Sequence, residues 1–175
     1  MNPHPFTLVH QLTASQQRLI DLLMPLPDDR FFAPKDGKWS AAETLQHLYL
    51  SARTLPRLLA GPRAVFDQWP HSGRTSRSYE TIVAVYNHTL QTNSITAPAS
   101  FVARPGDLEV SKTELLDRFT TTHQALADSL TNWSADELDA YQLPHPALGL
   151  LTVGETMHFT AYHIEHHRAI EASLL

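Results

Sequence analysis

Residues 157–170, MHFTAYHIEHHRAI, are the stretch around which the rest of the chain is organised. They contain no Gly or Pro, and their apolar residues recur at the spacing of a helix. His163 and His167 are four residues apart, so on a helix they lie one turn apart on the same face, where two imidazoles can hold one divalent metal ion. The same face continues through Val153, Thr156, Thr160, Ile170 and Leu174. This spacing predicts that both histidines face the interior of a helical bundle.

The histidine pair has two interpretations at this point. A buried imidazole needs a partner for its ring nitrogens, and a metal ion is one such partner. Two partly exposed histidines on a surface helix would show the same spacing. The pair alone leaves both interpretations open, so a third ligand elsewhere in the chain is needed to favour a metal site.

Composition limits the class of protein. The chain has 175 residues, and we expect residues 1–175 to form a single domain. The net charge is −5 and no basic run is present, which argues against nucleic acid as a partner. No apolar run approaches the ~20 residues that span a bilayer, and the first residues do not read as a signal peptide, so we expect a cytoplasmic protein without a membrane segment. Because there is no cysteine, a metal site must use His, Asp or Glu.

Two long helices are predicted in the first third of the chain. Apolar residues at spacings of three and four predict a first helix over Phe6–Leu26, which two prolines end. Residues 28–38 are polar and are expected to form a loop. The second helix begins at Ser40, is expected to bend at Pro56, and ends before residue 61.

Residues 63–110 are the least regular part of the sequence. They contain several prolines and a polar run, with one short helix predicted over Tyr79–Leu90. A connection of this length is unusual unless it carries function, and we expect it to cover one end of a bundle.

The third and fourth long helices are marked by their caps. A capping-box pattern, Ser or Thr followed three residues later by Glu, begins the third helix at Ser111 and the fourth at Thr152. The same pattern at Ser134 predicts a short helical turn, and residues 143–146 are expected to be extended or to form a turn. These elements predict an all-α fold, a four-helix bundle with a long crossover between helices two and three.

Three glutamates near the histidines have local explanations. Glu43 and Glu155 lie three residues after Ser40 and Thr152, so both are expected to act as cap partners and not as catalytic carboxylates. Glu165 faces a different side of its helix from the histidine pair and is expected to be solvated. His47, in the middle of the second helix, is a candidate third ligand, although an isolated histidine is more often packed or exposed than bound to metal.

Two motifs resemble a known family. Residues 39–48, WSAAETLQHL, resemble the Trp-Ser…Glu…His-Leu motif of the DinB-like superfamily, and residues 145–167 resemble its final segment, His-Pro…Gly-x-Leu-Thr…His-x-x-x-His. The resemblance implies a four-helix bundle, commonly dimeric, that binds nickel or zinc. By this resemblance the metal ligands are His47, His163 and His167.

The resemblance also implies a range of functions. Relatives include S-transferases that use bacillithiol and an isomerase that uses mycothiol, which implies an open three-histidine site that activates an external low-molecular-weight thiol, or water, toward a small-molecule substrate. The alternative is a non-catalytic, stress-associated metal-binding bundle. Thr156 and Ile170 depart from the family pattern, where an aromatic residue and Gln are common. Tyr162 and His166 neighbour the ligands but are expected to be a packing tyrosine and an exposed histidine, and His145 is a candidate for the rim of the site.

Overall fold

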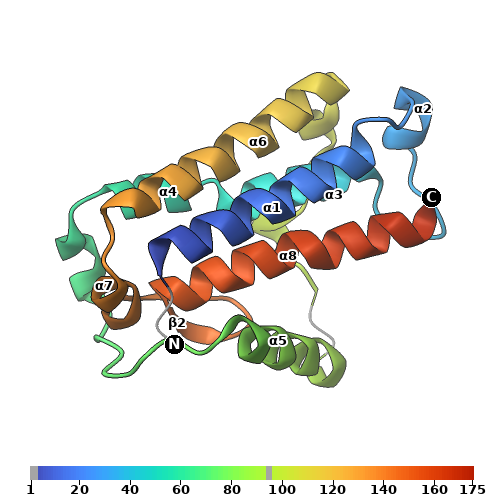
Figure 1. Cartoon of the computed structure of the whole chain (residues 1–175). Helices are drawn as coiled ribbons and strands as arrows, with labels where there is room; N and C mark the ends of the chain where they lie inside the picture. The colour runs from blue at the N-terminus through green and yellow to red at the C-terminus, as the bar shows by residue number, and fades with distance from the viewer. Residues whose placement is uncertain (1–3, 94–95) are drawn as a thin grey trace.

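The computed structural model describes residues 4–93 and 96–175. Four segments form the bundle, as Figure 1 shows: α1 (Pro5–Leu23), α3 (Ala41–Ala52) continued by α4 (Leu55–Ala60), α6 (Lys112–Ser129) and α8 (Val153–Leu174). Helix α1 packs against α6 and α8, and α6 also packs against α3 and α4. The predicted four-helix bundle with a long crossover is therefore confirmed.

Two apolar clusters fill the interior of the bundle. One contains buried residues from helices α1, α6 and α8 together with two aromatic residues: Leu8, Leu12, Leu126, Val153, Met157, Phe66 and Trp133. The other contains Leu19, Leu45, Phe119 and Ile164. The leucine stripes predicted for the long helices supply both clusters, because residues three and four apart fall on one helix face.

The first two predicted helices differ in detail from the observed ones. Helix α1 ends at Leu23, earlier than predicted, because Pro25 has no N–H and restricts the residue before it. The predicted loop at 28–38 contains a short helix, α2 (Asp28–Phe31), whose Phe31 is fully buried. The second predicted helix is two helices, α3 and α4, and Pro56 lies in the first turn of α4, where a missing N–H is tolerated.

The crossover contains one long α-helix, α5 (Tyr79–Asn93), which extends three residues beyond the predicted end at Leu90. Short 3₁₀ turns accompany it: η1 (Arg63–Gln68), η2 (Ala99–Phe101) and η3 (Pro105–Leu108). Helix α5 packs against α8 on the outside of the bundle, at the lower edge of Figure 1. The crossover therefore covers part of the length of α8.

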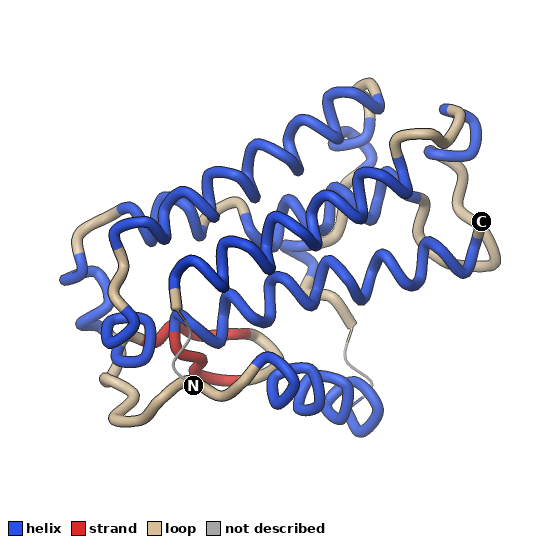
Figure 2. The backbone as a smooth tube through the Cα atoms, viewed as in Figure 1, coloured by secondary structure: helices blue, strands red, loops and turns tan. Residues whose placement is uncertain are grey.

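A β-hairpin precedes α8, and Figure 2 shows it as the red segment beside α5. After α6, the turn η4 (Leu130–Asn132) and α7 (Ala135–Ala140), strand β1 (Gln142–His145) pairs antiparallel with β2 (Gly149–Thr152). Gly149 has φ +72°, a backbone conformation that glycine adopts without strain. The sequence predicted an extended or turn segment at 143–146 but not the second strand. Among the described residues, no helix is long and apolar enough to cross a membrane.

Candidate metal centre

The beginnings of α3 and α8 are fixed by the caps that the sequence predicts. The Ser40 hydroxyl accepts a hydrogen bond from the Glu43 N–H, and the Glu43 carboxylate accepts one from the Ser40 N–H. Thr152 and Glu155 make the same reciprocal pair at the start of α8. The cap at α6 is only half formed: Ser111 accepts from Glu114 N–H, while the Glu114 carboxylate binds Arg118.

The structure brings His47, His163 and His167 together. The Nε2 atom of His163 lies 3.1 Å from His47 Nε2 and 3.2 Å from His167 Nε2. One ring nitrogen from each of the three residues lies within 4.8 Å of those of the other two. His47 and His163 are 5% and 7% exposed, and His167 is partly exposed. The three side chains converge from α3 and from two successive turns of α8.

The crossover fixes the tautomer of His47. Its Nδ1 lies 2.8 Å from the carbonyl oxygen of Phe101, in η2. A carbonyl only accepts, so Nδ1 carries the proton and Nε2 has a free lone pair. This is the arrangement of a metal-binding histidine, whose second nitrogen usually donates to a carbonyl or a carboxylate.

The three imidazoles are held in the neutral form. Burial lowers the pKa of His47, and the hydrogen bond to Phe101 offsets only part of this effect. Burial and the neighbouring histidines lower the pKa of His163, and they lower that of His167 to about 3. Neutral imidazole is the form that binds metal ions.

The convergence of these nitrogens fits a divalent cation. Because His47 Nε2 has no proton, the contact with His163 is a hydrogen bond only if His163 Nε2 is protonated. A protonated His163 Nε2 has no lone pair with which to accept a hydrogen bond from His167 Nε2. Its single proton is already donated to His47, so the contact with His167 cannot also be a hydrogen bond. A cation between the three rings would satisfy all three nitrogens, and imidazole donors suit zinc and nickel.

Aromatic residues hold the ligand rings in place. The Trp39 ring stacks on His167, with centroids 6.1 Å apart and planes 4° apart. Phe159, one turn before His163 on α8, stacks on that ring at 5.2 Å. Phe159 on α8 and Trp39, just before the N-cap of α3, therefore each place an aromatic ring against one of the three imidazoles.

A cavity of about 510 Å³ adjoins the three histidines. Its walls come from α3, α4, α5, α8, η2 and the turn of the β-hairpin. The volume is that of a small-molecule site, for which 300–1,000 Å³ is typical. The cluster therefore has one side turned toward a space large enough for a substrate.

His145 lies at this cavity, as predicted for the rim of the site. Its Nδ1 accepts hydrogen bonds from the backbone N–H groups of Ala147 and Leu148, at 3.2 and 3.1 Å. The proton is therefore on Nε2 of the neutral ring. Burial lowers the pKa of His145 to about 4, which keeps that tautomer neutral. The ring contacts Phe159, with centroids 4.2 Å apart.

The other residues near the pair have various roles. Tyr162 donates a hydrogen bond to Asn87 Oδ1 at 2.8 Å, which joins α8 to α5 and confirms the packing interpretation. His166 was expected to be exposed but is partly buried and lines the cavity. Glu165 was expected to be solvated, but it pairs with Arg18 and Arg168, each at 2.7 Å.

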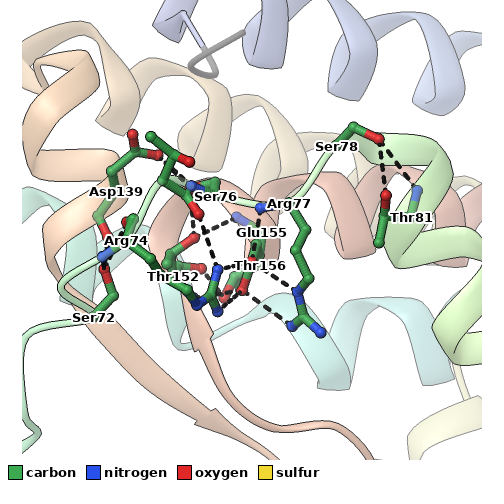
Figure 3. A network of polar contacts seen from close by, with 11 residues as sticks. Ser72, Arg74, Ser76, Arg77, Ser78, Thr81, Asp139, Thr152, Glu155 and Thr156 are labelled. Carbon is green, nitrogen blue, oxygen red and sulfur yellow. Dashed lines mark hydrogen bonds and ion pairs between the residues drawn. The ribbon is translucent and has the colours of Figure 1, made fainter.

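Glu155 is more than a cap. It is fully buried, and Arg74 and Arg77 from the crossover both bind its carboxylate, as Figure 3 shows. Ser76, between the two arginines, binds Asp139 and Thr152. Burial would raise the pKa of Glu155, but the hydrogen bonds from the two arginines outweigh it and lower the pKa to about 2. This network was not predicted from the sequence, in which two arginines in the crossover, Arg74 and Arg77, are its only signal.

The fold and the site together define a class of protein: a helical bundle with a three-histidine cluster that could hold a metal ion. The cluster adjoins a cavity. The chain belongs to the DinB superfamily, whose sequence model matches residues 11–170. The fold is similar to a solved structure from Bacillus subtilis described as "YfiT … a probable metal-dependent hydrolase with an unusual four-helix bundle topology". That match has a TM-score of 0.61 and 14% sequence identity, and covers 97% of this chain and 85% of the other. Among curated proteins, none matches the sequence.

Proposed function

We propose that the protein is a metal-dependent enzyme, similar to the thiol S-transferases, with His47, His163 and His167 as metal ligands. The observation that carries this proposal is the convergence of three neutral imidazoles at the wall of a substrate-sized cavity. Three protein ligands leave a coordination position free for a reactant, which is the pattern of catalytic and not of structural sites. We propose nickel or zinc as the metal and a small molecule as the substrate.

A divalent ion in this site supplies a Lewis acid that lowers the pKa of a thiol or a water molecule, so that an external low-molecular-weight thiol, or water, becomes nucleophilic at neutral pH. The residues of the chain orient the reactants. The Phe101 carbonyl keeps His47 Nε2 available as a ligand. Trp39 and Phe159 hold the rings of His167 and His163.

His145 is suited to bind the substrate. Its Nε2–H is a neutral donor at the cavity, fixed by two backbone hydrogen bonds to Nδ1. Its proximity to Phe159, which itself stacks on His163, places this donor on the metal side of the cavity. We propose that it donates to the acceptor group of the electrophile, and that negative charge developing there strengthens this hydrogen bond.

The two nucleophiles are distinguished by assay. Use of an external thiol agrees with the absence of cysteine from the chain, and use of water agrees with the printed description of YfiT as a metal-dependent hydrolase. Metal-loaded protein would be tested on chloro-dinitrobenzene and on an epoxide with bacillithiol, mycothiol, glutathione and cysteine, and on ester substrates without thiol. We expect metal-dependent turnover that requires a thiol. Turnover of esters alone would identify a hydrolase, and no turnover above the metal-free protein would leave the non-catalytic metal-binding bundle.

The proposal extends to the assembly and the place of action. We propose a single domain over residues 1–175 that functions as a homodimer in the cytoplasm and binds neither nucleic acid nor membranes. Sedimentation equilibrium measures the assembly directly. A monomer at all protein concentrations would contradict the dimer.

A further inference from the structure

The cavity wall carries no full charge. Among the described residues that line it, none is Lys, Arg, Asp or Glu. Much of its surface is aromatic, from Trp39, Trp69, Tyr86, Phe101 and Phe159. A wall of this kind receives flat apolar groups well, since aromatic side chains give large contact areas and favourable edge-to-face geometry.

Three hydroxyl groups at the cavity already donate hydrogen bonds to backbone carbonyls. Thr156 donates to the carbonyl of Thr152 at 3.0 Å, and Thr160 donates to the carbonyl of Thr156 at 2.8 Å. Ser51 on α3 donates to the carbonyl of Leu48 at 3.0 Å. These side chains therefore offer no proton to stabilise an anion, although they count as polar residues in the sequence.

The polar and apolar parts of the cavity lie at different positions along α8. His163 and His167 are at one end, whereas Thr156 is seven residues before His163, about 10 Å along the helix axis. Leu143, Pro144 and Pro146 of the hairpin region and Leu55 and Leu58 of α4 give the cavity apolar wall surface. A ligand whose reacting group is at the histidines thus has its body against apolar residues.

A charged group on that body would be poorly stabilised. Moving a carboxylate from water into an apolar site without a cationic partner costs several kcal/mol. Anything held at the three histidines uses the positive charge of the metal, which then does not compensate a second anion on the far side of the cavity.

Resting on the function proposed above, we infer that the cavity selects ligands with an uncharged, apolar body, preferably aromatic, whose one reacting polar group lies at the histidines. The inference covers the thiol as well as the electrophile. An arylalkyl thiol without a carboxylate fits the cavity, whereas the carboxylate-bearing parts of glutathione and bacillithiol must stay outside it.

Two ligands that differ by one charge test this inference. We would titrate Co²⁺-loaded protein with 4-(sulfanylmethyl)benzamide and with 4-(sulfanylmethyl)benzoate, which have nearly the same shape. Tryptophan fluorescence reports occupancy of the cavity, because Trp39 and Trp69 line it. The sulfur-to-cobalt charge-transfer band reports whether the thiol reaches the metal. We expect the amide to bind at least about tenfold more tightly, a difference of about 1.4 kcal/mol.

A second arm separates this inference from the proposed function. Metal-free His163→Ala protein, checked for its helical circular dichroism, would be titrated with 4-methylbenzamide and 4-methylbenzoate, which have no thiol. We again expect the amide to bind more tightly. Absence of the charge-transfer band with either thiol would contradict the proposed metal chemistry but leave this second arm to decide the charge preference.

Two results would overturn this inference. Benzoate binding as tight as that of the amide in the second arm would show that the cavity stabilises an anion despite its uncharged wall. Failure of the neutral thiol to change the fluorescence of the metal-loaded protein would show that the cavity does not receive an aromatic body.

Discussion

At the scale of single residues, a backbone hydrogen bond holds His47 in the tautomer that a metal ligand needs. Its proton is held on Nδ1 by a carbonyl of the crossover, so the lone pair of Nε2 faces His163. A histidine free to choose its tautomer would spend part of its time with the proton on the metal-facing nitrogen. The candidate site is therefore preorganised by Phe101, which is not one of the three candidate ligands.

The first prediction concerns metal content. Wild-type protein is expected to bind about one divalent ion per chain, as one three-ligand site allows, and His163→Ala is expected to lose most of it. The central Nε2 atom, adjacent to both other ligands, is removed by this change. Elemental analysis of protein purified without an affinity tag measures the content. His88→Ala, at an exposed position of α5, is the matched control; equal content in all three proteins would refute the ligand assignment.

A second prediction concerns His145. His145→Phe retains an aromatic ring against Phe159 but removes the Nε2–H donor. Because a hydrogen bond to a developing charge is worth about 1.5–3 kcal/mol, we expect kcat/KM to fall about 10- to 100-fold. Metal content should stay at the wild-type value, which elemental analysis checks. Unchanged kcat/KM in a folded, metal-loaded variant would mean that His145 only shapes the hairpin turn.

A third prediction concerns pH and His123 in α6, away from the metal centre. The side chain is 1% exposed and its Nδ1 donates to the Phe119 carbonyl; burial lowers its pKa to about 4. The unfolded chain, with an ordinary pKa near ~6.5, binds the proton first, so stability falls as pH drops from 6.5 toward 4. Between pH 7 and 5 this residue should remove about 2 kcal/mol from the free energy of unfolding.

Urea denaturation of wild type and His123→Gln at the two pH values measures this effect. Glutamine has no titratable group, so the difference between the two proteins isolates the contribution of His123. The variant is expected to lose less stability than wild type on acidification. A parallel loss in both proteins would assign the pH dependence to other groups.

At the scale of elements, the Glu155 network ties the crossover to the beginning of α8. The carboxylate is fully buried, whereas Arg74 and Arg77 are 40% and 33% exposed, so solvent reduces the net value of each ion pair. Removing the glutamate charge would nevertheless leave both arginines without their carboxylate partner at a position where the glutamate side chain itself is fully buried. The network therefore stabilises the position of the irregular segment 72–78 that leads into α5.

This network gives a fourth prediction. Glu155→Gln is expected to lower the free energy of unfolding by about 3 kcal/mol, while Glu43→Gln, which affects a cap without arginine partners, should cost about 1 kcal/mol. Thermal and urea denaturation measure both. Since the pKa of Glu155 is lowered to about 2, its contribution is complete above pH 4.5 and is lost as pH falls toward 2. Equal destabilisation by the two changes would show that Glu155 stabilises the protein only as a helix cap and that its arginine partners add nothing.

At the scale of the whole molecule, the metal is expected to stabilise the fold without creating it. The two apolar clusters and the capped helices do not depend on the three histidines. A site held at 100 times its dissociation constant adds ~2.7 kcal/mol to the folded state. Chelation should therefore lower Tm but leave the helical circular dichroism at low temperature unchanged. Loss of helicity on chelation would show that the site is structural.

Much of this architecture could be predicted because its determinants are local. Leucine spacing identified the long helices, and the Ser40 and Thr152 caps fixed where two of them begin. A bend was predicted at Pro56, and the chain does break between α3 and α4 just before that residue. The second strand of the hairpin was not predicted, because it forms only by pairing with β1. Spacing identified His163 and His167 as a candidate ligand pair. His47 was a candidate from its place in the second helix, but only the family motif linked it to the pair, since 116 residues separate it from His163.

The partners of Glu155 had no periodic signal at all. Arg74 and Arg77 lie 81 and 78 residues before it and contact it only after the crossover has folded onto α8. The cavity was likewise beyond prediction, because its walls come from six elements whose relative positions no local pattern specifies.

The contact between His47 and Phe101 also has a kinetic consequence. The carbonyl that sets the tautomer is 54 residues from the ring that it controls, so this contact closes a long loop and carries the entropic cost of doing so. Helices form in about a microsecond, whereas closure of the crossover onto a packed bundle is a slower, later event. If the three histidines bind a metal ion as proposed, we expect a refolding chain to form its four helices before it binds the ion, because η2 must first dock against His47.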